Sequence, residues 1–259
     1  MEEVLRQVEN ELASSVVAGR LAFRSLQSQV LNKLGLQIVS GEFAPESLLP
    51  VDSELLIRFD VSRTILREAM QALAAKNLVE ARARVGTKVL PRRRWNMFDP
   101  DVLRWHFEAG PNEEFFRNLA EIRSSIEPES AALAAERRSD AQIIALFRCV
   151  DGMEVARQQE AFAKHDLSFH KIVAEASANP FMSAITALVD VALASAFGIS
   201  SPVDDPAAQI VTVGNHRRIA QAIQDRNPQA AREAMRTVIQ VGYDRSLGKM
   251  SKAKQLQKT

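Results

Sequence analysis

Cysteine, tyrosine and tryptophan are scarce in this 259-residue sequence, which contains one, one and two of them. The single cysteine, Cys149, excludes an internal disulfide and any cysteine-rich zinc finger. The most apolar stretch, FMSAITALVDVALASAF, is too short for a membrane helix and is interrupted by Asp190. The start, MEEVLRQVEN, lacks the basic and apolar regions of a signal peptide. These absences predict a cytoplasmic protein without a membrane partner.

Charge is distributed unevenly along a chain of ordinary globular composition. Apolar residues make up 46% and charged residues 25%, and this length can bury the core of one or two domains. The formal net charge is +1, but residues 63–94 contain nine basic and two acidic residues, and nine minus two gives +7. The rest of the chain therefore sums to −6 (+1 minus +7). This pattern predicts a basic module joined to a mildly acidic body.

The order of helix and turn patterns predicts a mainly α protein with two domains. Residues 21–91 alternate helices and turns and then give two short extended pieces, as in a winged helix-turn-helix with a small β-hairpin wing. Later segments are almost wholly helical and predict an all-α bundle of about six or seven helices. We therefore expect an N-terminal extension (1–20), the winged helix-turn-helix (21–91), a linker (92–98), the bundle (99–246) and a disordered basic tail (247–259).

Residues 62–67 have the character of a recognition-helix N-terminus. Ser62 can cap the helix RTILREAMQALAAKN, whose first turns present Arg63, Thr64 and Arg67. A helix in the major groove points its N-terminal side chains at base edges, while hydroxyls and main-chain amides hold phosphates. The blander interpretation is that the arginines simply solvate one helix face.

A basic hairpin is predicted to follow this helix. In LVEARARVGTKVL, Gly86 suits the tip of a two-stranded wing that carries Arg82, Arg84 and Lys88. Such a wing lies over the adjacent DNA backbone and adds salt-dependent affinity. The coincidence of turn residues, arginine placement and a local charge of +7 favours DNA binding over mere solvation.

The stretch from Ile38 to Val89 resembles the winged helix-turn-helix of the GntR family of bacterial transcription regulators. The matching positions are Ile38, Gly41, Pro45, Leu49, Pro50, Glu54, Leu55, Val61, Ser62, Arg63, Arg67, Glu68, Ala69, Leu73, Leu78, Val79, Gly86 and Val89. The resemblance implies that Arg63 and Arg67 make the main base and phosphate contacts, assisted by Ser62 and Thr64, and that the Gly86 wing enters the minor groove.

Two positions depart from the GntR pattern. Ser53 stands where a basic residue is common, which removes one expected phosphate contact. Glu46 stands where glycine is usual, which predicts a slightly different turn.

The run HDLSFH contains a possible pair of metal ligands. Asp166 and His170 are four residues apart, so both project from one helix face and can hold one divalent ion. His216, followed by helical apolar spacing, is a third candidate, whereas His165 lies about 100° away around the helix. The blander alternative is an ordinary ion pair between Asp166 and His170 on a solvated face.

Residues 99–245 resemble the FCD-type effector domain of one GntR subfamily. The match rests on Asp166, Phe169, His170, His216, Ile219, Ala222, Ile223, Ala231, Ala234 and Met235. The resemblance implies a metal bound by one Asp and three His at the bottom of a pocket, where it helps to hold a small carboxylate. Here the last histidine is replaced by Val238, which cannot bind a metal.

Three protein ligands still suffice for Zn²⁺, Mn²⁺ or Ni²⁺ when water or effector oxygens complete the shell. A hydroxy-carboxylate, with a carboxylate and an adjacent hydroxyl, suits such an open site. Weak or absent metal binding is the alternative consequence of Val238.

Arg123 and Glu127 stand four residues apart in EIRSSIEPESAA. They can form a surface ion pair, but the FCD resemblance implies that the arginine lines the effector pocket. Arg123 is thus the candidate for bidentate pairing with the effector carboxylate, with Glu127 beside it. Because residues 180–215 contain no Lys or Arg, we expect Arg123 to supply most of the fixed positive charge besides the metal. The segment RRRWNMFDPDVLRWHFE also resembles repressors of aldonate catabolism.

These patterns predict a ligand-responsive repressor that binds operator DNA as a homodimer, because paired half-sites need two reading heads. A small carboxylate, such as a sugar acid, would release it from DNA. Three alternatives stay open: a regulator that responds to another organic acid without metal, a metal-dependent hydrolase with Glu127 as general base, and a DNA-architectural protein that senses nothing.

Overall fold

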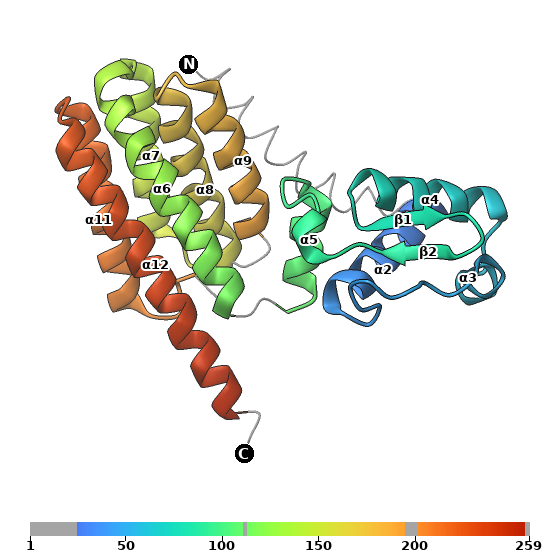
Figure 1. Cartoon of the computed structure of the whole chain (residues 1–259). Helices are drawn as coiled ribbons and strands as arrows, with labels where there is room; N and C mark the ends of the chain where they lie inside the picture. The colour runs from blue at the N-terminus through green and yellow to red at the C-terminus, as the bar shows by residue number, and fades with distance from the viewer. Residues whose placement is uncertain (1–24, 111–112, 195–200, 257–259) are drawn as a thin grey trace. The chain divides into compact units, whose positions relative to one another are not determined.

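The computed structural model describes residues 25–110, 113–194 and 201–256, without the side chains of residues 190–194 and 252–256. The predicted N-terminal extension lies outside the described residues. The chain divides into two compact units, with the boundary between residues 111 and 112. Figure 1 shows the elements of each unit.

The first unit is a winged helix-turn-helix. It contains α2 (Leu26–Ser40), α3 (Asp52–Phe59), α4 (Arg63–Ala75), β1 (Val79–Arg82), β2 (Gly86–Val89), the short 3-10 helix η2 (Arg92–Arg94) and α5 (Pro100–Glu108). Helix α2 ends at Gly41, whose φ of 89° closes a left-handed cap that glycine adopts without strain. As predicted, Ser62 caps α4, its Oγ accepting a hydrogen bond from the amide of Ile65 at 3.4 Å.

The wing is an antiparallel hairpin. Val79 pairs with Val89 and Arg82 with Gly86, so residues 83–85 form the loop. Gly86 has a φ of 111°, and Arg84 also takes the left-handed conformation, at φ 62°. Leu48 forms an isolated bridge with Lys88, so the segment before α3 borders the second strand.

The backbone conformation at Glu46 explains why glycine is usual at this position. Its φ is 70°, the left-handed region in which a Cβ is unfavourable. The turn therefore keeps a glycine-like backbone, and the prediction of a different turn receives no support from this angle.

Helix α5 packs in the first unit. Trp105 is fully buried, and its ring lies 2.6 Å from the point where a Cβ on Gly35 of α2 would stand. Asn32 of α2 accepts a hydrogen bond from Trp105 Nε1 at 3.0 Å, and Lys76 Nζ lies 2.8 Å from Asp99 Oδ2 at the start of α5. We predicted that the bundle begins at residue 99; the structure instead groups α5 with α2 and α4 because Trp105 fills the space over Gly35.

The second unit is all α. Its described helices are α6 (Glu113–Arg137), α7 (Asp140–Val155), α8 (Gln159–Ala176), α9 (Pro180–Ala194), α11 (Pro206–Gln224) and α12 (Pro228–Leu256). The apolar faces of α6, α7, α8, α11 and α12 share one core that includes the fully buried Leu146, Met153, Phe169, Ile219 and Met235. Helix α9 packs on α8 through a smaller cluster of Val189 and Leu167. The predicted fold class, a winged helix-turn-helix plus a helical bundle, is confirmed.

The prediction of a disordered tail at 247–259 was wrong for its first ten residues. Helix α12 continues to Leu256, while residues 257–259 lie outside the described part. The segment KMSKAKQL is rich in strong helix formers and contains no proline, so nothing stops the helix there.

Candidate functional site

The first candidate surface is the N-terminal half of α4. Ser62, Arg63, Thr64 and Arg67 are all exposed, while Leu66, Ala69 and Leu73 are buried beneath them. The side chains of Arg63 and Arg67 form no hydrogen bond or ion pair with any part of the chain that the structure describes. The arginines are therefore available to an external partner.

The wing adds further basic groups to the same unit. Arg82 and Arg84 are exposed, and Arg82 Nη2 lies 3.0 Å from Glu80 Oε2. Lys88 is half-buried, with Nζ 3.9 Å from Glu46 Oε1. Both acidic partners are partly exposed, and such surface pairs contribute little, so phosphates can replace them.

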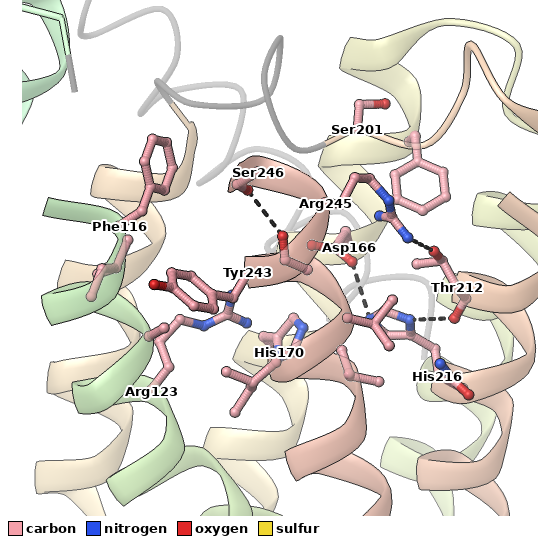
Figure 2. A pocket seen from close by; sticks show the side chains of 18 residues that line it. Phe116, Arg123, Asp166, His170, Ser201, Thr212, His216, Tyr243, Arg245 and Ser246 are labelled. Carbon is pink, nitrogen blue, oxygen red and sulfur yellow. Dashed lines mark hydrogen bonds and ion pairs between the residues drawn. The ribbon is translucent and has the colours of Figure 1, made fainter. Parts of the chain in front are cut away.

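The second candidate site is a pocket inside the helical unit, with a cavity volume of about 70 Å³. It is lined by residues of α6, α8, α11 and α12, together with Ser201, and Figure 2 shows them converging on one space. The predicted Arg123, Asp166, His170 and His216 all line it, and so does Val238. Residues more than 100 positions apart in the sequence thus meet in one site.

Asp166, His170 and His216 form a possible metal site. One donor atom from each lies within 4.8 Å of the others. Both histidines are almost fully buried, at 3% and 1% exposure, yet Nε2 of each has no hydrogen-bond partner among the described residues. A buried polar atom without a partner is unfavourable, so this donor set fits a bound cation.

The tautomer of His216 strengthens this fit. Nδ1 lies 2.9 Å from the Thr212 carbonyl oxygen, which can only accept, so Nδ1 carries a proton and donates it. In the neutral ring Nε2 then carries a lone pair and no proton. This nitrogen lies 3.1 Å from Asp166 Oδ1. Two acceptors at this distance repel each other unless a proton or a metal ion lies between them.

Asp166 remains ionised in this setting. Burial alone would raise the pKa of its carboxyl, but the contact with His216 and the charges of His216, His170 and Arg123 lower that pKa to about 2. A permanently charged carboxylate is the form that binds a metal ion.

Glu127 does not line the pocket, although we expected it beside the effector. It is 5% exposed and accepts two hydrogen bonds from Arg123, at 2.5 Å from Nε and 3.1 Å from Nη2. Its Oε2 also lies 2.9 Å from His170 Nδ1. Burial would raise the pKa of Glu127, but the charges of Arg123 and His170 hold that pKa far below its usual range. Such a carboxylate is a poor general base, which argues against the hydrolase alternative.

Arg245 is a charged pocket residue that the sequence prediction missed. It comes from α12, and its Nη2 donates to Thr212 Oγ1 at 2.5 Å. Burial lowers the pKa of its guanidinium, while Asp166 and Asp205 oppose that shift. The expectation that Arg123 supplies most of the pocket's fixed positive charge was therefore wrong. Val238 and Arg245 are seven residues apart on one helix and therefore share a face. Since Val238 was expected at the pocket, this spacing could have indicated that Arg245 also lines it.

The remaining lining is mixed. Hydroxyls and an amide come from Ser201, Thr212, Asn215, Tyr243 and Ser246, and apolar side chains come from Phe116, Leu119, Phe162, Val238 and Ile239. A ligand with several hydroxyls and an anionic group matches this surface. None of the helices in the described ranges is long and apolar enough to cross a membrane.

Two family profiles match the chain. Residues 26–89 match the bacterial regulatory proteins of the gntR family, and residues 118–241 match the FCD domain. The galactonate operon transcriptional repressor of Escherichia coli K12 is 32% identical over 212 residues, covering 82% of this chain and 92% of that protein. The HTH-type transcriptional repressor NanR of Klebsiella aerogenes is 30% identical over 241 residues, covering 90% of each chain.

A solved structure shares the fold. Lar, which controls the expression of the Listeria monocytogenes agr system, aligns with a TM-score of 0.63 and 17% identity, covering 87% of this chain and 98% of that chain.

Proposed function

Because the chain belongs to the GntR family of bacterial transcription regulators and carries an FCD domain, we propose that it is a repressor released from operator DNA by a small hydroxy-carboxylate. It is a transcription regulator and not an enzyme, which removes the hydrolase alternative. Both curated relatives above are named as repressors, and one name specifies the galactonate operon. A sugar acid of the aldonate type is the effector class that we propose.

In this proposal the exposed face of α4 reads the operator. Arg63 and Arg67 contact base edges and phosphates in the major groove, with Ser62 and Thr64 on the backbone. Arg82, Arg84 and Lys88 of the wing bind the adjacent backbone around Gly86. A homodimer in the cytoplasm supplies the two reading heads that paired half-sites require.

The observation that carries the effector half of the proposal is the pocket. Two arginines and a row of hydroxyls surround three metal donors, two of which are buried imidazole nitrogens without hydrogen bonds. A divalent ion would be held by Asp166, His170 and His216, and it would add positive charge that attracts carboxylate and hydroxyl oxygens. In the view of Figure 2, Arg123 and Arg245 lie on either side of these donors. From there both guanidinium groups would pair with the acid.

Val238 is consistent with this ligand class. Its side chain offers no fourth donor, so coordination positions remain for the effector. An acid with an adjacent hydroxyl can fill two of them by chelation, whereas a simple carboxylate lacks the second oxygen.

A thermal-shift comparison tests the proposal. The protein is loaded with Zn²⁺ or treated with EDTA, and each sample receives galactonate, its neutral parent sugar galactose, or hexanoate, which has a carboxylate but no hydroxyl. We expect galactonate or a related aldonate to raise Tm most strongly in the Zn²⁺ sample, and the two control compounds to raise it little. If no sugar acid stabilises the protein and EDTA changes nothing, the metal-assisted sensor is wrong.

A further inference from the structure

We propose that Glu127 is a positioning residue that couples acid binding at Arg123 to metal binding at His170. The inference rests on the proposed metal-assisted function and adds a route by which the two ligands strengthen each other. It assigns Glu127 a role outside the effector contact that the sequence suggested.

A single buried carboxylate oxygen is shared between the two sites. Glu127 Oε2 accepts from Arg123 Nη2 at 3.1 Å and lies 2.9 Å from His170 Nδ1, while Oε1 accepts from Arg123 Nε at 2.5 Å. Glu127 and Arg123 lie on α6, and His170 lies on α8, which packs against it. In Figure 2 the side chains of Arg123 and His170 lie next to each other at the pocket wall.

The geometry shows a competition for this carboxylate. It is aligned with the guanidinium of Arg123, with which it makes two hydrogen bonds. His170 Nδ1 is within 2.9 Å of Oε2, yet the direction is unsuitable and no hydrogen bond forms. Arg123 therefore holds Glu127 in an orientation that does not serve the histidine.

The orientation of Glu127 affects His170 as a metal ligand. A histidine that binds metal through Nε2 is a stronger and better-oriented ligand when its Nδ1–H donates to a carboxylate. Since Val238 removes the usual fourth donor, each remaining ligand contributes a larger share of the affinity. The metal site should thus be sensitive to how tightly Arg123 holds Glu127.

An acid bound at Arg123 changes this balance. The carboxylate of the acid accepts one or more of the hydrogen bonds that the Arg123 guanidinium donates to Glu127. Glu127 can then turn and accept a hydrogen bond from the Nδ1–H of His170. Acid binding then strengthens metal binding, and because coupling between two sites is reciprocal, metal strengthens acid binding by the same factor.

A double-mutant cycle in Zn²⁺ affinity tests the coupling without knowledge of the natural acid. Zn²⁺ affinity is measured by competition with a chromophoric chelator for the wild type, Glu127→Gln, Arg123→Gln and the double variant. In the Arg123→Gln background, where Glu127 is free to orient His170, Glu127→Gln should weaken Zn²⁺ binding about 10- to 100-fold, as expected for loss of a residue that orients a metal ligand. With Arg123 present, the same substitution should weaken Zn²⁺ binding much less. Arg123→Gln should strengthen Zn²⁺ binding, and this gain should be at least about fivefold larger with Glu127 present than in the Glu127→Gln protein.

Arg245→Gln is the matched control for charge alone. Arg245 also lines the pocket, but it bonds to Thr212. Its removal should change Zn²⁺ affinity by the same factor with and without Glu127. Because Arg123→Gln leaves a buried carboxylate without its partner, circular dichroism checks each fold, and Arg123→Lys provides a second variant that keeps the charge but loses the two-point contact. Arg123→Lys should also increase Zn²⁺ affinity, but by less than Arg123→Gln does.

The outcomes separate the inference from the proposed function. If the wild type binds no Zn²⁺, the proposed metal site is wrong and the coupling falls with it. If the wild type binds Zn²⁺ and Glu127→Gln does not weaken Zn²⁺ binding in the Arg123→Gln background, only the coupling is wrong. Equal effects of Arg123→Gln in both backgrounds also contradict it, because Arg123 would then act as a distant charge only.

Discussion

The arginines of the two units are held in opposite ways. The side chains of Arg63 and Arg67 on α4 are exposed and have no hydrogen-bond or ion-pair partner among the described residues. Those of Arg123 and Arg245 are partly buried and hydrogen-bonded to Glu127 and Thr212. Salt screens exposed charges strongly and buried ones weakly. The first pair suits a polyanion that arrives from outside, and the second pair suits a small acid that enters a prepared site.

The largest effect is expected from removing the exposed pair. Arg63→Ala combined with Arg67→Ala should weaken operator binding by about 2–6 kcal/mol, roughly 30-fold to 10⁴-fold, because each arginine contact to a base contributes about 1–3 kcal/mol. Arg67→Ala alone should weaken operator binding by about 1–3 kcal/mol. Fluorescence anisotropy with an operator fragment selected from random DNA measures the loss.

The control for this prediction uses Arg93→Ala and Arg94→Ala, which change exposed arginines of η2 outside α4. These should change specific and non-specific binding alike and only slightly. Circular dichroism of the α4 variant should remain that of the wild type. Retained operator specificity after loss of Arg67 would refute the recognition-helix assignment.

The two histidines of HDLSFH provide a test of the buried metal site. His170→Ala removes one of three donors and should weaken Zn²⁺ binding by more than the roughly 100-fold upper effect of an orienting residue. His165→Ala should leave Zn²⁺ affinity unchanged, because that ring lies against Gly152, at 2.5 Å from the position of an added Cβ. Equal Zn²⁺ affinities of the two variants in a chelator competition would be incompatible with the site.

A smaller effect is expected on the stability of the first unit. Gly35→Ala places a methyl group 2.6 Å from the Trp105 ring and should lower the free energy of unfolding by about 1–3 kcal/mol. Gly214→Ala in α11, where an added Cβ meets nothing within 4 Å, should instead stabilise slightly because alanine favours helix. Urea unfolding monitored by circular dichroism distinguishes the two, and a Gly35→Ala protein as stable as the wild type would contradict the packing of α5.

The smallest effect is expected at the turn before α3. Glu46→Gly should stabilise the first unit by about 1 kcal/mol or less, because glycine adopts the observed φ of 70° without a Cβ clash. It also frees Lys88 from its carboxylate neighbour and should slightly increase DNA affinity. A lower midpoint in urea would show that the turn relies on the Glu46 side chain.

The two units also differ in how far the sequence predicts them. Ser62 and Gly86 act within a few residues, so local capping and turn chemistry predicted α4 and the wing. The burial of Trp105 over Gly35 joins positions 70 residues apart, and no local pattern indicates it. The predicted domain boundary failed for that reason.

The pocket shows the same limit. Asp166 and His170 share a helix face and were predictable as a pair, and His216 was a third candidate from its own helical pattern. The family resemblance supported His216 and placed Arg123 in the pocket. Arg245 was missed because its approach to Thr212 depends on how α11 and α12 pack. The shared Glu127 oxygen likewise exists only through the contact of α6 with α8.

Release of operator DNA measured with and without metal tests the central claim most directly. Protein bound to a labelled operator fragment is titrated with galactonate or the most stabilising aldonate, in parallel after loading with Zn²⁺ and after treatment with EDTA. We predict that the acid releases the operator at a clearly lower concentration in the Zn²⁺ sample, and that His170→Ala removes this difference. Release at the same acid concentration in both samples would contradict a metal-assisted pocket as the sensor.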